Sequence, residues 1–139
     1  MEWEQASVSF NELQSLFNSH YLEIYGKNIE VESKMFKYLE TQGKLFFLVT
    51  RDNGKAVGYY AVSTCPSVYD HRKVEAKDVG IYVTPEYRKQ GITTKMQEVM
   101  DIGLKTNNVH SVYVSYPSET TIPTNAGYVK KEIIYERKL

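Results

Sequence analysis

Cysteine is almost absent from this 139-residue chain, because Cys65 is the single one and no internal disulfide can form. Excess charge of one sign is also absent: 17 basic residues balance 17 acidic ones, which counts against a dedicated nucleic-acid binder. No apolar run approaches the roughly 18 residues of a membrane-spanning helix. The first five residues are acidic and polar, unlike a secretory signal. These absences predict a cytoplasmic protein without a membrane segment or a nucleic-acid partner.

Metal-ligand spacing is missing as well. The possible ligands His20, His71, His110 and Cys65 are scattered along the chain, so no metal site is predicted. Length and an ordinary hydrophobic fraction of 42% predict one domain spanning residues 1–139.

Two helices are predicted before the first clear strand. The first begins near Ser9, where Glu12 three residues later completes a capping-box pattern, and Gly26 ends it. The second is predicted over residues 32–41 and ends before Gly43. Its inward residues are expected to be Met35, Tyr38 and Leu39. We expect the two helices to form a hairpin packed on a sheet.

The remaining pattern predicts a mixed sheet. Asn53-Gly54 is a strong hairpin turn that joins two antiparallel strands, and Gly80 suggests a bulge. A strand–helix–strand unit over residues 79–114 predicts a right-handed crossover between parallel neighbours. Strands are expected over residues 45–50, 56–63, 73–83 and 109–115, with a last one within 127–137. The fold class is therefore α/β of the α+β type, with a mostly antiparallel central sheet.

The most informative stretch follows the third of these strands. Pro85 ends the strand after Val83, and the basic turn at residues 88–91 opens directly into a helix. The apolar positions of that helix share one face: Ile92, Met96, Val99, Met100 and Leu104. The first N–H groups of a helix lack intrahelical partners, and a glycine beside them admits a ligand to the backbone. This combination suits a diphosphate.

The pattern Arg88-x-x-Gly91-x-Thr93, preceded by Val83, Pro85 and Tyr87, resembles the acyl-CoA signature of the GNAT N-acetyltransferase superfamily. Ala126-Gly127-Tyr128 near the end is similar to that family too, so that the resemblance covers residues 73–139. Thr93 stands where the family usually has glycine or alanine. The resemblance implies a GNAT-like acyltransferase fold with acetyl-CoA as co-substrate.

This resemblance assigns cofactor contacts by position. The N–H groups of residues 90–94 would hold the diphosphate, and the backbone of residues 81–83 would pair with the pantetheine arm. That strand must then separate from its parallel neighbour at residues 112–115, which creates a switch point for the ligand. The implied cofactor-binding residues are Ile81, Tyr82, Val83, Arg88, Lys89, Gln90, Gly91, Ile92, Thr93, Thr94 and Asn125.

Catalytic residues are less well defined by the sequence. Glu75 and Asp78 are the acidic residues of the cofactor strand, on opposite faces by alternation, and Glu75 is the preferred base. The family's glutamate falls on Lys77 and its tyrosine acid on Pro123, which cannot supply a proton. The remaining phenols near the expected cleft are Tyr116 and Tyr135.

The sequence thus predicts an acetyl-CoA-dependent N-acetyltransferase for a primary amine. The acceptor stays open between a small molecule, a peptide N-terminus and a lysine side chain. A rival reading is a catalytically degenerate GNAT fold used for binding or structure, favoured by Pro123 and Thr93. Pairing into a homodimer through sheet edges is also left open.

Overall fold

The protein, described here by a computed structural model for residues 1–115, 127–130 and 134–139, is built on one sheet of five strands. The strands lie in sequence order, and β4 and β5 are parallel whereas every other neighbouring pair is antiparallel. Their bounds are β1 Glu2–Trp3, β2 Leu45–Asp52, β3 Lys55–Pro66, β4 Val74–Val83 and β5 Ser111–Tyr113. The predicted mixed, mostly antiparallel sheet is confirmed.

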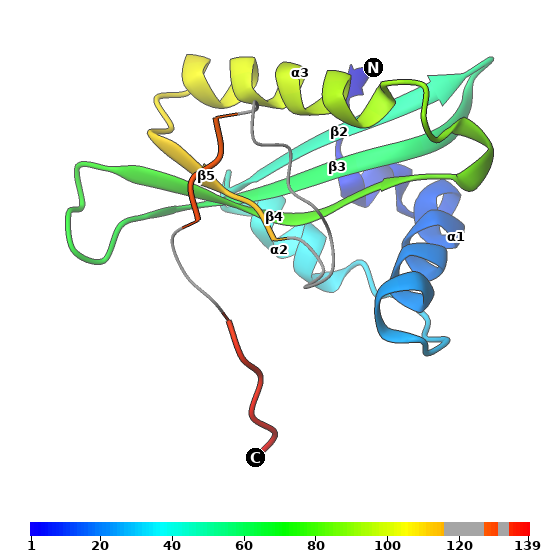
Figure 1. Ribbon diagram of the computed structural model, residues 1–139, viewed down its shortest axis with the longest axis horizontal. Helices are drawn as coiled ribbons and strands as arrows, with labels where there is room; N and C mark the ends of the chain where they lie inside the picture. Colours follow the sequence, from blue (N-terminus) through cyan, green and yellow to red (C-terminus); the bar gives the residue numbers. More distant parts are fainter. Residues whose placement is uncertain (116–126, 131–133) are drawn as a thin grey trace.

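Helices cover both faces of this sheet (Figure 1). The helices α1 (Ala6–Tyr25) and α2 (Lys34–Thr41) pack on one face, and α3 (Ile92–Thr106) packs on the other. Leu13 and Phe17 of α1 are buried in the first core, and Met96 and Met100 of α3 in the second. Burial of each such side chain is worth about 1.5–3 kcal/mol. In the described residues, no helix is long and apolar enough to cross a membrane.

The first helix begins earlier than the capping-box pattern predicts. Its first residue is Ala6, and the Ser9 hydroxyl donates to Glu4 Oε2 at 2.5 Å. Glu12 accepts hydrogen bonds from Arg51. The capping-box prediction is therefore wrong, because Ser9 pairs with Glu4 just before the helix and Glu12 pairs with the distant Arg51. The predicted end is right: Gly26 caps α1 in the left-handed conformation with φ 66°.

The inward face predicted for the second helix is partly wrong. Met35 and Tyr38 are exposed, whereas Phe36 packs against the first core and stacks on Phe17 with ring centroids 5.0 Å apart. α2 begins at Lys34, later than predicted, and its eight residues are too few for periodicity to fix the buried face. Leu39 is half-buried, as expected.

The hairpin turn and the bulge occur where the sequence predicts them. Asn53 and Gly54 both have positive φ, 48° and 83°. Between β3 and β4 the pairing passes from Ala61 with Gly80 to Val62 with Asp78, which leaves Val79 as the additional residue.

Two predicted strands differ from the structure. β5 covers only Ser111–Tyr113 of the predicted residues 109–115. The described part of residues 127–137 contains no strand, in contrast to the prediction. β5 pairs with β4 only from Glu75 to Lys77, just before the bulge at Val79, so alternation of apolar and polar residues overestimates its length.

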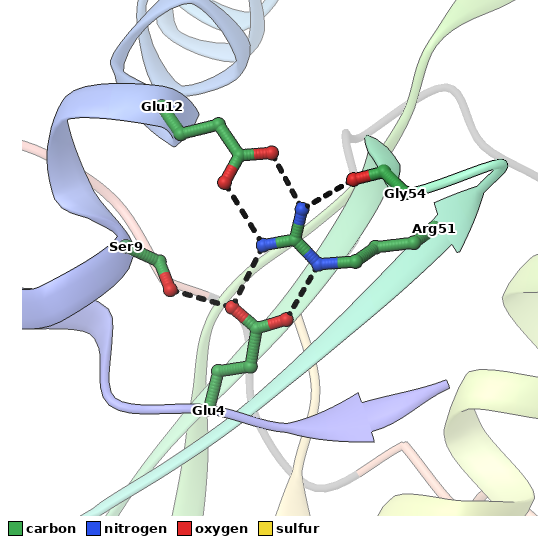
Figure 2. Close-up of polar contacts among 5 residues, drawn as sticks. All are labelled: Glu4, Ser9, Glu12, Arg51 and Gly54. Atoms are coloured by element: carbon green, nitrogen blue, oxygen red, sulfur yellow. Dashed lines mark hydrogen bonds and ion pairs between the residues drawn. The ribbon is translucent and has the colours of Figure 1, made fainter.

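Arg51 connects the N-terminal segment to the β2–β3 hairpin (Figure 2). Its Nε donates to Glu4 Oε1 at 2.8 Å and its terminal nitrogens donate to Glu12 and to the Gly54 carbonyl. The Glu4 side chain is 13% exposed. The hydrogen bond from Arg51 is the main cause that lowers the pKa of Glu4, and burial opposes it.

We predict that Arg51→Met destabilises the protein by about 2 kcal/mol at pH 7, because hydrogen bonds to charged groups are worth about 1.5–3 kcal/mol. The folded-state pKa of Glu4 is lowered, so its contribution is present above the unfolded pKa and is lost as pH falls through the folded pKa. Urea unfolding from about pH 7 to pH 3 should therefore show a shrinking difference from the parent. Arg72→Met, at an exposed pair with Asp70, is the control. A difference that stays constant with pH contradicts this account.

Candidate active site

The turn between β4 and α3 is fixed at both ends. A single 3₁₀ turn, η1 (Pro85–Tyr87), follows β4, and the Tyr87 hydroxyl donates to Asp52 Oδ2 at 2.7 Å. Two later residues, Lys89 (φ 63°) and Gly91 (φ 77°), adopt the left-handed conformation. This conformation costs a residue with a side chain roughly 1–2 kcal/mol, so glycine is favoured at Gly91.

The first turn of α3 exposes unpaired backbone donors. The first hydrogen bond at this end runs from the Lys95 N–H to the Gly91 carbonyl at 3.0 Å. The N–H groups of Ile92, Thr93 and Thr94 precede it and therefore have no acceptor within the helix. No side chain caps this end, and a Cβ placed on Gly91 would meet no atom within 4 Å. A helix start with unpaired N–H donors favours the binding of an anion such as a diphosphate.

Arg88 points away from this first turn. Its Nε donates to the Val83 carbonyl at 2.8 Å, and a terminal nitrogen donates to Glu23 of α1 at 2.7 and 2.9 Å. The guanidinium also lies 5.4 Å from the centre of the Tyr82 ring. Arg88 thus holds the turn against β4 and α1, and its contact with a cofactor stays a prediction.

The parallel strands separate in the middle of β4. Pairing covers three positions, ending with Lys77 opposite Tyr113. The Ser115 N–H then donates to both carboxylate oxygens of Asp78 at 3.1 Å. From Asp78 onward, β4 has only β3 as a strand partner within the described residues. Pairing therefore ends later in β5 than expected, because Val112 and Tyr113, two residues of the segment predicted to separate, still pair with Ala76 and Lys77. Burial raises the pKa of Asp78.

The other candidate catalytic residues are dispersed. Glu75 is half-buried in the stretch where β4 pairs with both β3 and β5. Tyr135 is 85% exposed. Tyr116, Pro123 and Asn125 lie outside the described residues. The structure therefore brings Asp78 to the separation point and leaves the roles of the others as predictions.

One histidine was not selected from the sequence but lies beside β4. His20 of α1 is hydrogen-bonded to Tyr59 of β3 and stacked on Tyr82 of β4, with ring centroids 5.1 Å apart. Sequence spacing offers no signal for this contact, because the residues are 39 and 62 positions apart along the chain and meet only after packing. In the part of the chain that the structure describes, no group of three or more His, Cys, Asp or Glu side chains could hold a metal ion.

A family model named "Acetyltransferase (GNAT) family" matches residues 10–127, which includes the turn, α3 and the strand separation. The chain belongs to the GNAT acetyltransferase family. The expected fold and enzyme class are thereby confirmed. A search of curated proteins gave no match.

Solved structures of acetyltransferases share this fold. An aminoglycoside acetyltransferase from an uncultured soil metagenomic sample, in complex with sisomicin, is 20% identical with a TM-score of 0.69 and coverage of 95% and 90% of the two chains. A GNAT family acetyltransferase from Staphylococcus aureus is 14% identical, with a TM-score of 0.74 and coverage of 99% of this chain and 96% of the other. The ribosomal-protein-alanine N-acetyltransferase from Brucella melitensis gives the same values. The GNAT fold thus extends over almost the whole chain.

In this GNAT protein, Asp78→Ala should expose the Ser115 amide to hydrogen exchange and cost about 1–3 kcal/mol, because a donor loses its acceptor. Asp78→Asn keeps an acceptor oxygen and should be at least as stable as the parent at pH 7. The raised folded-state pKa means that the charged form is disfavoured on folding, so this penalty grows as pH rises through the folded pKa. Exchange rates and urea unfolding measure both effects. Equal exchange of Ser115 in the alanine variant and the parent would refute this role.

Proposed function

We propose that this GNAT protein transfers the acetyl group of acetyl-CoA to a primary amine. The exposed first turn of α3 and the separation of β4 from β5 together carry this proposal. A single charge placed at a helix start contributes little alone, about 0.3–1 kcal/mol. A diphosphate site next to an open strand edge accounts for both features at once.

Acetyl-CoA is proposed to lie along the second half of β4. Its diphosphate would accept hydrogen bonds from the N–H groups of residues 90–94, with Lys89 and the Thr93 or Thr94 hydroxyl beside them. Its pantetheine arm would pair with the backbone of residues 81–83, whose edge toward β5 is open within the described chain. Running in this direction, the thioester reaches Gly80 and Asp78, where the strands part.

The chemistry needs a neutral amine and a route for its proton. The amine nitrogen forms a bond to the acetyl carbonyl carbon, the carbon–sulfur bond breaks, and sulfur leaves with the electron pair. The thiol of coenzyme A has a pKa near the ~8.5 of free cysteine, so the thiolate leaves readily. Removal of the amine proton is the more demanding part, because a protonated amine cannot attack.

The acceptor is proposed to be a primary amine on a small molecule, a peptide N-terminus or a lysine. Two structural neighbours, an aminoglycoside acetyltransferase and a ribosomal-protein-alanine N-acetyltransferase, support the range from small molecule to protein. Cys65 is free and exposed, which suits the reducing cytoplasm that we propose as the location. Pairing into a homodimer is compatible with this function.

Acetyl-CoA should raise the melting temperature by on the order of 5–10 °C at 100 times its dissociation constant, because a ligand of the native state then stabilises it by about 2.7 kcal/mol. Acetate should not raise it. Release of free thiol in the presence of sisomicin or an alanine-initiated peptide then tests transfer. Binding without turnover on a broad amine panel would favour the binding-protein rival. Absence of binding would refute the proposed function.

Gly91→Asn should abolish most acetyl-CoA binding while leaving the fold intact. Asparagine tolerates the left-handed conformation of Gly91 (φ 77°), and the free protein has room for its Cβ. A side chain there would nevertheless occupy the approach of the diphosphate to the backbone. Isothermal titration calorimetry should show a loss of at least about 10-fold in affinity. Gly26→Asn, also left-handed and open but at the end of α1, is the matched control. Unchanged affinity places the diphosphate elsewhere.

A further inference from the structure

His20 lies against the point of β4 where the strand bulges. A Cβ built on Gly80 would approach the His20 ring to 2.9 Å at Cε1 and 3.3 Å at Nδ1. Any side chain at this position would therefore displace the imidazole. The absence of a side chain at Gly80 lets one edge of the ring rest on the β4 backbone, with Nε2 one bond beyond Cε1.

The hydrogen bonds of His20 leave one ring nitrogen available. Nδ1 is 2.5 Å from the Tyr59 hydroxyl. Within the described chain, this is the only hydrogen bond of the ring, and the side chain is half-buried rather than enclosed. Burial raises the pKa of Tyr59, so its hydroxyl stays protonated and can serve as a neutral partner of Nδ1. If Nδ1 carries a hydrogen and donates it to this hydroxyl oxygen, Nε2 has a free lone pair.

The charged and titratable groups that face His20 come from α1, from β3, from β4 and from the turn after β4. Glu23 lies one turn further along α1, Arg88 follows β4, and Tyr59 and Tyr82 belong to the sheet. Burial is the largest effect and lowers the pKa of His20; Glu23 raises it and Arg88 lowers it. The imidazole is consequently neutral at pH 7, the form that a proton acceptor needs.

We propose that His20 is the general base of this enzyme, with Tyr59 as the residue that positions it. The inference rests on the proposed function, which brings the thioester to Gly80. The attacking amine would approach from the α1 side, form its bond to the acetyl carbon and release one proton to His20 Nε2. The thiolate leaves with the electron pair of the broken carbon–sulfur bond, and the imidazolium returns its proton to that sulfur or to water. Every proton and electron pair is then accounted for.

Glu75 is the competing base. Between Glu75 and Gly80 the strand contains five steps, including the extra residue Val79, or on the order of 15 Å at 3.3 Å per residue. Glu75 also lies where β5 still occupies the edge of β4. His20 is in contact with the strand at the open part, and is therefore better placed for an amine attacking there.

The test uses His20→Asn, whose amide nitrogen replaces Nδ1 toward Tyr59 and which lacks Nε2. At pH 7 we expect kcat to fall about 10²–10⁴-fold, the usual worth of a general base, with the KM for acetyl-CoA nearly unchanged. In the parent, kcat/KM should rise through a pKa below the ordinary ~6.5 of histidine, because burial lowers that of His20. In His20→Asn, the rise of kcat/KM with pH should instead follow the pKa of the amine itself. His71→Asn, at an exposed loop residue, is the matched control.

A second measurement is independent of the choice of amine. The ring nitrogen signals of His20 should report hydrogen on Nδ1, and acetyl-CoA should shift the ring signals of His20 but not those of His71. Tyr59→Phe should change the His20 tautomer and reduce kcat. Gly80→Ala should displace the ring and reduce kcat, while acetyl-CoA still raises the melting temperature.

The outcomes separate this inference from the function on which it rests. If the parent binds acetyl-CoA and acetylates an amine, but His20→Asn retains turnover within about 2-fold across the pH range, His20 is not the base. The same conclusion follows if Glu75→Gln alone shows the loss, or if bound acetyl-CoA leaves the His20 signals unmoved. If the parent does not bind acetyl-CoA at all, the proposed function itself fails.

Discussion

The slip of one residue in β4 determines how the two halves of the molecule fit together. Ala76 belongs to the core under α3, and Tyr82, six residues later, belongs to the core under α1. An even spacing would place both on the same face of a regular strand. The extra residue Val79 reverses the alternation, so that Val83 joins Ala76 in the core under α3 while Tyr82 faces the core under α1. The same slip turns Gly80 toward His20.

Within the described residues, the part of β4 after Lys77 has no strand partner on the side of β5, and unpaired backbone groups there would cost free energy if they were buried. Backbone donors and acceptors inside a sheet are almost always satisfied, because an unpaired buried group costs about as much as a lost hydrogen bond. At the separation point Asp78 meets part of this cost by accepting the Ser115 N–H, despite the burial that raises its own pKa. An extended amide chain such as pantetheine would satisfy the rest.

Local signals in the sequence predicted where helices and turns lie, whereas long-range contacts determine the partners of the side chains. Asn53-Gly54, the glycine end of α1 and the periodicity of α3 act within a few residues, so they could be read directly. The capping pair at Ser9 and Glu12 could not, because the Ser9 hydroxyl donates to Glu4 and the Glu12 carboxylate accepts from Arg51, 39 residues later. The acidic partner of Arg88 and the position of His20 likewise depend on how α1 lies across the sheet. The predicted site residues Tyr116 and Asn125 lie outside the described residues, so their roles stay predictions.

The contacts of Arg88 connect the diphosphate turn to the candidate base. Arg88 and His20 both lie on the Tyr82 ring, and Glu23 interacts with each of them. Burial is the main cause that lowers the pKa of His20; Glu23 raises it, and the positive charge of Arg88 lowers it further. Under the proposed function, a diphosphate held a few residues away would bring negative charge that opposes this effect and would raise the pKa of His20. Because attraction weakens with distance and solvent screening, this rise would be small, but its direction would make the proposed base stronger with acetyl-CoA bound than without it.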